Sequence, residues 1–198
     1  MTDVQQPILT EPRLSEIDIV PAMLDRTIPE EFIDYNGHLN VRFYMEIQLE
    51  GAARLFETLG MDTKELETSG RSTFAREHHI RYHAECMKGH RVTVHPVLVG
   101  RTERNLHLIS YLVNQTTQQL ASVIEIVMTH VDMRTRRPVE WGHWAPVIDA
   151  QIAARPLEPA VLLHPGPSVR PARPEQSHSS SSLDRHPTAR ATPPTGGP

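Results

Sequence analysis

Residues 33–60 read IDYNGHLNVRFYMEIQLEGAARLFETLG, and this stretch decides the fold of the chain. An Asn-Gly pair near its start is a strong turn signal, so the chain reverses before the apolar residues begin. Apolar side chains then recur at helical spacing, which predicts one long, largely buried helix over residues 41–59. Asn40 can serve as its N-cap and Gly60 can end it. Gly51 inside the helix costs about 1 kcal/mol relative to alanine, which predicts a close approach of another element there.

Alternating apolar and polar residues flank this helix on both sides. Residues 23–33 form a short extended segment, and Pro29 within it predicts an edge position or a bulge because proline cannot donate to a strand ladder. Beyond the helix, four longer alternating runs are separated by turns, which predicts an antiparallel meander. One apolar helix needs a curved sheet around it, so the predicted class is α+β, with a curved antiparallel sheet wrapped around one long central helix. The four predicted strands are residues 72–83, 91–99, 105–113 and 120–131.

The composition divides the chain into three parts. We expect residues 1–22 to be a flexible leader, residues 23–152 to be one folded domain, and residues 153–198 to be a disordered tail. The tail holds ten of the 17 prolines and a run of four serines, so it buries too little to offset the entropy cost of ordering. Within the domain, Trp141 and Trp144 follow the last predicted strand and either cap the core or line a neighbouring subunit's pocket.

The charge balance excludes several classes of partner. The whole chain carries −4 and the tail carries five arginines against three acids, so residues 1–152 carry −6. Nucleic-acid binding needs concentrated positive charge, so we expect no nucleic-acid partner. No apolar run approaches the roughly 18 residues of a membrane span, and no signal peptide is visible, so we expect no membrane partner. The single Cys86 cannot form an intrachain disulfide, and together these features predict a cytoplasmic protein.

Residues 33–41, together with Tyr44, closely resemble the signature of the hotdog-fold acyl-CoA thioesterases of the 4-hydroxybenzoyl-CoA thioesterase type. That signature is an aspartate, two residues, Gly-His, an apolar residue, an asparagine, and a tyrosine four residues later. The likeness continues through residues 77–82 and covers about residues 27–137. The segment Asp-Tyr-Asn-Gly-His is most similar to that of the betainyl-CoA thioesterases of carnitine metabolism, whereas residues 45–50 depart from that subgroup.

The resemblance implies an acyl-CoA substrate that is hydrolysed without a metal or other cofactor. It also implies a homodimer or homotetramer with active sites at the subunit interface. By motif match, Asp34 is the catalytic carboxylate, and the backbone amide at Val41 polarises the thioester carbonyl. His38 either shapes the loop or donates a hydrogen bond to that carbonyl. The substrate-binding positions that the resemblance adds are Gly37, Asn40 and Tyr44.

Elementary chemistry explains why one turn before a helix suits this reaction. Thioester hydrolysis needs a group that activates water or attacks directly, and a group that stabilises the developing oxyanion. A carboxylate just before a helix can do the first, and the unpaired N–H groups of the first helical turn can do the second. The residues alone leave open whether Asp34 is nucleophile or general base, or only an Asx-turn residue that bonds its own loop. Asn40 fits a helix cap better than a catalyst.

Other residues offer alternatives. Glu46 and Glu50 lie four residues apart on the predicted helix, where another hotdog branch carries a catalytic glutamate, but they also fit a solvated or interface face. His78, His79 and His83 crowd one predicted strand. Strand alternation and rise place them too far apart to share one metal ion, so we predict no metal site. The alternative functions are a hotdog dehydratase and a non-catalytic acyl-CoA-binding module.

Overall fold

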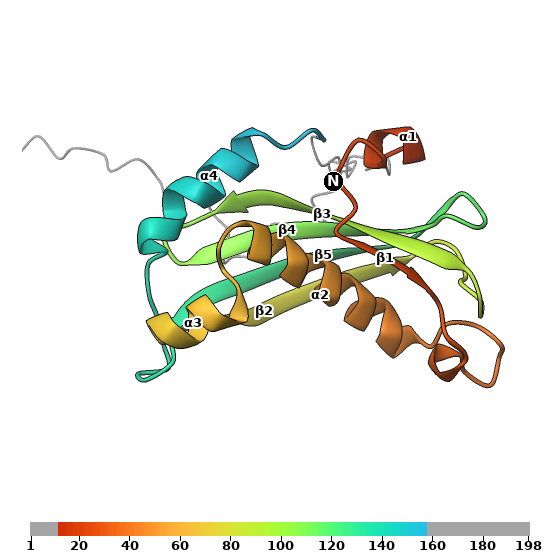
Figure 1. The fold of residues 1–198 in the computed structure, drawn as a ribbon, viewed down its shortest axis with the longest axis horizontal. Helices are drawn as coiled ribbons and strands as arrows, with labels where there is room; N and C mark the ends of the chain where they lie inside the picture. The colour runs from red at the N-terminus through yellow and green to blue at the C-terminus, as the bar shows by residue number, and fades with distance from the viewer. Residues whose placement is uncertain (1–11, 158–198) are drawn as a thin grey trace, which may run out of the picture.

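A computed structural model describes residues 12–157 of the chain (Figure 1). At its centre, helix α2 (Val41–Thr58) lies against one face of an antiparallel sheet with the strand order β1-β3-β4-β5-β2, and β6 pairs with β5. The predicted α+β architecture, an antiparallel sheet wrapped around one long helix, is confirmed. The strands are β1 (Leu24–Thr27), β2 (Arg71–Tyr82), β3 (Arg91–Arg101), β4 (Asn105–Asn114), β5 (Gln119–Asp132) and β6 (Arg137–Pro138).

Two further helices were not predicted, namely α3 (Thr63–Ser69) and α4 (Ala145–Ala153). Helix α3 carries ordinary helix signals, because the side chain of Asp62 accepts from the amide of Glu65 at 2.8 Å and the helix ends at Gly70 in the left-handed conformation. The remaining helical segments are α1 (Leu14–Ile17) and the 3-10 turns η1 (Glu30–Phe32) and η2 (Gly142–Trp144).

The strand order corrects the predicted meander. Strands β3, β4 and β5 pair consecutively, but β2 pairs with β5 instead of β3. Helix α2 carries the chain from β1 at one edge of the sheet to β2 at the other, and the segment after β2 crosses back toward β3. Alternation identifies a strand without identifying its neighbours, so the sequence pattern did not reveal this order. Strand β1 lies at an edge, one of the two alternatives that Pro29 suggested, but it ends at Thr27, and Pro29 precedes the 3-10 turn η1 instead.

The two halves of α2 pack on different parts of the core. Its first half lies with β1 and the beginning of β3, and its second half lies with the middle of β4 and β5 and with the two tryptophans. The apolar side chains of α2 in the first cluster are Phe43, Tyr44 and Ile47, and those buried in the second are Ala52 and Leu55.

The glycine inside α2 marks the close approach that its position predicts. A Cβ atom added at Gly51 would lie 2.4 Å from Cγ1 and 2.8 Å from Cβ of Val94 on β3. Such distances are too short for carbon atoms in contact, and Cβ of Val94 moves only with its strand. Gly51 therefore allows the middle of the helix to sit directly on the sheet.

We expect Gly51→Ala to lower the free energy of unfolding by about 1–2 kcal/mol. Overpacking typically costs about 1–3 kcal/mol, and the better helix propensity of alanine returns up to about 1 kcal/mol. Chemical denaturation measures the difference in the free energy of unfolding between the variant and the wild type. Ala53→Gly, at an exposed position of the same helix, isolates the propensity effect. Helix propensity alone would make Gly51→Ala stabilising by the same free energy by which Ala53→Gly is destabilising. That result would contradict the close packing against Val94.

The described part of the predicted leader packs on the sheet. Ile17 is fully buried and Val20 is nearly so, and both contact the sheet face opposite α2. The side chain of His95 on β3 lies 2.8 Å from the carbonyl oxygen of Val20 and fixes this segment. A flexible leader is therefore wrong for residues 12–22, because their apolar side chains cover outer sheet surface. Residues 1–11 and the predicted tail beyond Leu157 lie outside the described residues.

The tryptophans belong to the core of this chain. Trp141 is 1% exposed and Trp144 is 4% exposed, and both pack in the cluster under the second half of α2. The ring of His130 stacks on Trp141 with a centroid distance of 4.7 Å. Of the two predicted alternatives, capping the core is therefore the one that the structure supports.

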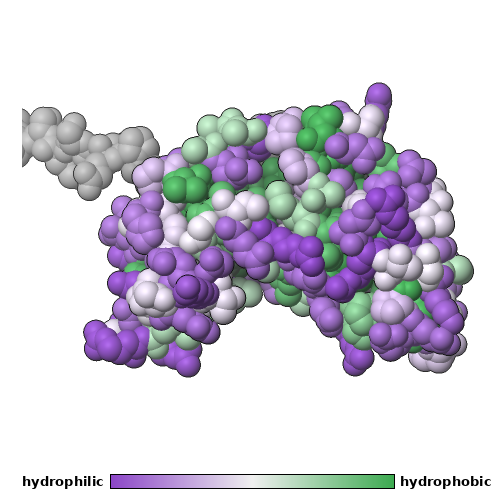
Figure 2. Space-filling model, in the orientation of Figure 1, coloured by the Kyte–Doolittle hydropathy of each residue, from purple (hydrophilic) through white to green (hydrophobic). Residues whose placement is uncertain are grey.

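On the face seen in Figure 2, polar side chains surround small, separate apolar areas. Within residues 12–157, the structure contains no helix with the length and apolar character that crossing a membrane requires.

Candidate active site

A tight loop before α2 holds the predicted site residues. The backbone N–H of Asp34 donates to the carbonyl of His38 at 2.9 Å, and the N–H of Gly37 donates back to the carbonyl of Asp34 at 3.0 Å. Gly37 has a φ of +84°, a conformation that glycine adopts without steric cost. The N–H of Leu39 donates to the carbonyl of Cys86 at 2.7 Å. This last bond joins the loop to the segment that follows β2.

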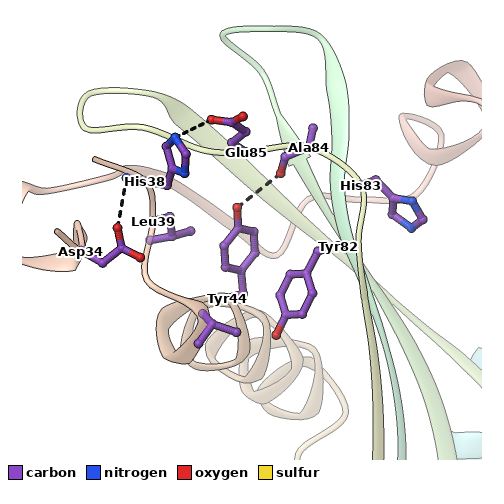
Figure 3. Close-up of a pocket in the computed structure, with 9 residues that line it drawn as sticks. Asp34, His38, Leu39, Tyr44, Tyr82, His83, Ala84 and Glu85 are labelled. Carbon is purple, nitrogen blue, oxygen red and sulfur yellow. Dashed lines mark hydrogen bonds and ion pairs between the residues drawn. The ribbon is translucent and has the colours of Figure 1, made fainter. Parts of the chain in front are cut away.

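The carboxylate of Asp34 has one engaged oxygen and one open oxygen. Its Oδ1 accepts from the backbone N–H of Asn36 at 2.8 Å and from that of His38 at 3.4 Å. The Asx-turn interpretation is therefore correct for Oδ1. Among residues 12–157, no donor makes a hydrogen bond to Oδ2, and the half-buried side chain lies at the wall of a pocket (Figure 3). The loop thus positions the carboxylate and leaves one oxygen available.

The first turn of α2 has an unsatisfied backbone donor at a residue that lines the same pocket. Asn40 is the N-cap, and its Oδ1 accepts from the N–H of Arg42 at 3.1 Å, while the N–H of Phe43 donates to the carbonyl of Asn40 at 2.9 Å. The N–H of Val41 precedes the first intrahelical bond and has no acceptor among the described residues. Val41 also lines the pocket. Partial positive charge at a helix N-terminus favours a developing anion at this place.

The capping geometry predicts the effect of Asn40→Ala. Loss of the cap should lower the free energy of unfolding by about 1 kcal/mol and change turnover only a few-fold. Denaturation curves and activity are measured on the same preparation. Asp62→Ala, which removes the equivalent cap of α3, is the matched control. A loss of activity in Asn40→Ala of a hundredfold or more, without a loss of stability, would contradict the assignment of Asn40 as a cap.

The opposite wall of the pocket comes from the end of β2 and the residues after it. The hydroxyl of Tyr44 on α2 donates to the carbonyl of Ala84 at 3.3 Å. Burial raises the pKa of the Tyr44 phenol, so this side chain remains a proton donor at neutral pH. The rings of Tyr44 and Tyr82 meet nearly at right angles, with centroids 5.1 Å apart. Figure 3 shows the two rings side by side, with the Asp34 loop beyond Tyr44.

His38 is held by a polar contact with a carboxylate of this wall. Its Nε2 lies 2.7 Å from Oε2 of Glu85, and both side chains are partly exposed. The contact ties the loop before α2 to the segment after β2 a second time. It supports the loop-shaping alternative for His38, while the carbonyl-binding role stays a prediction.

The pocket has a volume of about 390 Å³. Of the six predicted site residues, Asp34, His38, Val41 and Tyr44 line it. Gly37 and Asn40 do not line it, because the first supplies the turn and the second caps the helix, so substrate binding by these two stays a prediction. The lining residues that the sequence did not predict are Leu39, Tyr82, His83, Ala84 and Glu85.

Of the pocket wall formed by the end of β2 and the residues after it, the sequence indicated only a part. Tyr82 belongs to a segment that resembles the thioesterases, but placing it beside α2 requires the pairing of β2 with β5. In the register, Tyr82 lies opposite Ser122, next to the buried side chain of Gln48. No sequence pattern marks Glu85, which enters the pocket because the chain crosses back after β2.

The alternative catalytic glutamates lie outside this pocket. Glu50 forms ion pairs with Arg26 at 2.9 Å and Arg54 at 2.8 Å, and Glu46 is exposed on α2. Within residues 12–157, no group of three or more histidine, cysteine, aspartate or glutamate side chains is arranged to hold a metal ion.

Residues 28–152 match the sequence model of the thioesterase-like superfamily. The chain belongs to the thioesterase-like superfamily. The matched residues include α2, strands β2 to β6 and every residue that lines the pocket. This superfamily assignment agrees with the resemblance of the segment before α2.

Two relatives of this superfamily member carry the name betainyl-CoA thioesterase. The chain is 31% identical over 103 residues to a betainyl-CoA thioesterase of Pseudomonas aeruginosa, covering 52% of this chain and 65% of that protein. It is 30% identical over 136 residues to an L-carnitine dehydrogenase/betainyl-CoA thioesterase of Ruegeria pomeroyi, covering 69% of this chain and 25% of that protein. The chain thus matches less than two thirds of the length of each relative.

A solved structure shares the fold of this superfamily member. The protein SAV2348 from Staphylococcus aureus, determined in complex with CoA, superposes with a TM-score of 0.62 at 26% identity. The superposition covers 67% of this chain and 84% of that chain. A 1,4-dihydroxy-2-naphthoyl-CoA thioesterase from Synechocystis has the same fold, with a TM-score of 0.60 at 10% identity over 67% of this chain and 97% of that chain. This likeness agrees with the hotdog fold class predicted from the sequence.

Proposed function

We propose that this protein hydrolyses an acyl-CoA thioester to a free acid and CoA, with Asp34 as the catalytic carboxylate. The observation that carries the proposal is the meeting of two groups at one pocket. The open Oδ2 of Asp34 and the unpaired N–H of Val41 both lie at the junction that leads into α2. Membership of the thioesterase-like superfamily and the two betainyl-CoA thioesterase relatives support the same reaction.

Each group answers one requirement of the chemistry. The carboxylate either takes a proton from a water molecule that attacks the thioester carbon, or attacks that carbon itself to give an anhydride that water then hydrolyses. In both routes the N–H of Val41 stabilises the negative charge that develops on the carbonyl oxygen. The carbon–sulfur bond then breaks, and CoA leaves as a thiolate that takes up a proton. The hydrogen bonds from Tyr44 to the carbonyl of Ala84 and from Leu39 to the carbonyl of Cys86 hold the two walls of the pocket together during these steps.

The test is free-thiol release from a panel of acyl-CoA thioesters with short, medium, long, aromatic and betainyl acyl groups. We expect turnover of at least one of them. Saturable binding of the panel without thiol release would contradict the hydrolase proposal and favour a non-catalytic acyl-CoA-binding module.

The exposed edge of the sheet supports a homo-oligomer. Strand β2 has twelve residues and, within residues 12–157, pairs only with β5, and its side chains from Phe74 to His79 are exposed. A long unpaired edge readily accepts another strand, so we propose that two copies pair through β2. Light scattering should then give twice or four times the chain mass of 22.4 kDa. A mass of 22.4 kDa at micromolar concentration would contradict it.

A further inference from the structure

The pocket beside Asp34 carries an unbalanced set of charges. Of the nine described residues that line it, Asp34 and Glu85 are carboxylates, His38 and His83 are histidines, and none is lysine or arginine. The ring of His38 contacts Glu85, and the carboxylate of Asp34 has no cationic partner among the described residues. A positively charged acyl group placed there is attracted by both carboxylates, whereas a carboxylated acyl group is repelled. The pocket is therefore complementary to a cation.

The aromatic side chains provide the second feature that a cation needs. Tyr82 is 49% exposed, and its ring lies at 83° to that of the buried Tyr44, so the two rings form a corner in which Tyr82 supplies the open face. Aromatic faces attract cations through their quadrupole, and such corners suit quaternary ammonium groups, which have no N–H to donate. The hydroxyl of Tyr44 is occupied by the carbonyl of Ala84, which fixes its ring.

The size of the acyl group follows from where these residues lie. Tyr44 is three residues beyond Val41 on α2, so it lies within one helical turn of the proposed oxyanion donor. A cation held against the tyrosine corner must then be close to the thioester carbonyl. An ammonium group that is separated from the carbonyl by a single methylene meets this requirement.

We propose that Tyr82 and Glu85 are specificity-determining residues that select an acyl group with a fixed positive charge next to the thioester. This inference rests on the proposed acyl-CoA hydrolysis. Tyr82 supplies an open aromatic face, and Glu85 supplies a counter-charge whose position is set by its contact with His38. The betainyl-CoA thioesterase relatives act on an acyl group of this chemistry.

Two substrates of nearly the same shape separate the effect of the acyl group's charge on kcat/KM from the effect of its size. Betainyl-CoA and 3,3-dimethylbutanoyl-CoA have nearly the same shape, but only the first carries a positive charge. We expect the wild type to favour betainyl-CoA in kcat/KM. Tyr82→Leu and Glu85→Gln should each reduce kcat/KM for betainyl-CoA by roughly 3- to 30-fold and leave the neutral substrate within about 3-fold. Tyr82→Phe keeps the aromatic face and should retain the preference.

The controls separate specificity from stability and from net charge. Glu103→Gln makes the same charge change in the turn after β3, at the end of the sheet away from the pocket, and should leave both substrates unaffected. Thermal unfolding of each variant confirms that it folds. Equal kcat/KM for the two substrates in the wild type, or equal losses on both in the variants, would overturn the proposal and leave acyl-CoA hydrolysis intact.

A binding readout keeps the two proposals distinguishable. Calorimetry on Asp34→Ala compares the affinity for both substrates without relying on turnover. If the wild type hydrolyses no member of the acyl-CoA panel but Asp34→Ala prefers betainyl-CoA, cation selection stands and hydrolysis fails. If Asp34→Ala binds the two equally and adding Glu85→Gln changes neither affinity, cation selection is wrong.

Discussion

Asp34→Asn should reduce kcat by roughly 10²- to 10⁴-fold, the range that a positioned acid–base group contributes. The substitution removes the charge and keeps a carbonyl oxygen in the place of Oδ1. The hydrogen bonds from the amides of Asn36 and His38 are therefore retained, and the loop keeps its shape. Free-thiol release under saturating substrate measures the loss.

The matched comparison is Asp34→Ala, which removes both the charge and the turn bonds. We expect similar activity losses in the two variants and a lower melting temperature only in Asp34→Ala. Activity in Asp34→Asn close to that of the wild type would show that Asp34 serves the turn alone, and it would leave Glu46 and Glu50 as the next carboxylates to test.

Val41→Pro should reduce kcat by roughly 10²- to 10³-fold, because it deletes the backbone N–H proposed to stabilise the oxyanion. Proline is favoured at the first position of a helix, where the N–H has no intrahelical acceptor. The preceding residue, Asn40, has φ −60° and ψ 137°, a conformation that proline allows before it. The helix should therefore form normally.

Val41→Ala is the control, since it shortens the side chain and keeps the N–H. The side chain of Val41 is 60% exposed, so we expect Val41→Ala to keep most of the activity. Equal activities in the proline and alanine variants would rule out the N–H of Val41 as the oxyanion donor and move attention to the neighbouring amides.

The sequence predicted the elements of the fold better than their arrangement. The bounds of α2, its Asn40 cap and the close approach at Gly51 depend on neighbours in the chain or on one missing Cβ, and the structure confirms all three. The pairing of β2 with β5 depends on how a helix crosses a sheet, which alternation does not encode. Residues 12–22 were misjudged because their few apolar side chains gain burial only once the outer sheet face exists.

The candidate site divides in the same way. The wall that precedes α2 was predictable because a turn, a cap and a helix start follow one another in the sequence. The wall formed by Tyr82 and Glu85 was not predictable, because it reaches the loop only through the crossing after β2. The bond from Leu39 to the carbonyl of Cys86 joins these two walls and has no local signature.

The most direct test of the account crosses Asp34→Asn with Val41→Pro and measures free-thiol release from one substrate that the wild type cleaves. Groups that act as a unit on one transition state lose activity non-additively. We predict that each single variant loses at least a hundredfold in the rate of thiol release. The double variant should be only slightly less active than the less active of the two single variants. If the activity loss of the double variant equalled the product of the two single losses, the two groups would not act at one shared site. Wild-type activity in either single variant would rule out the proposed role of that group.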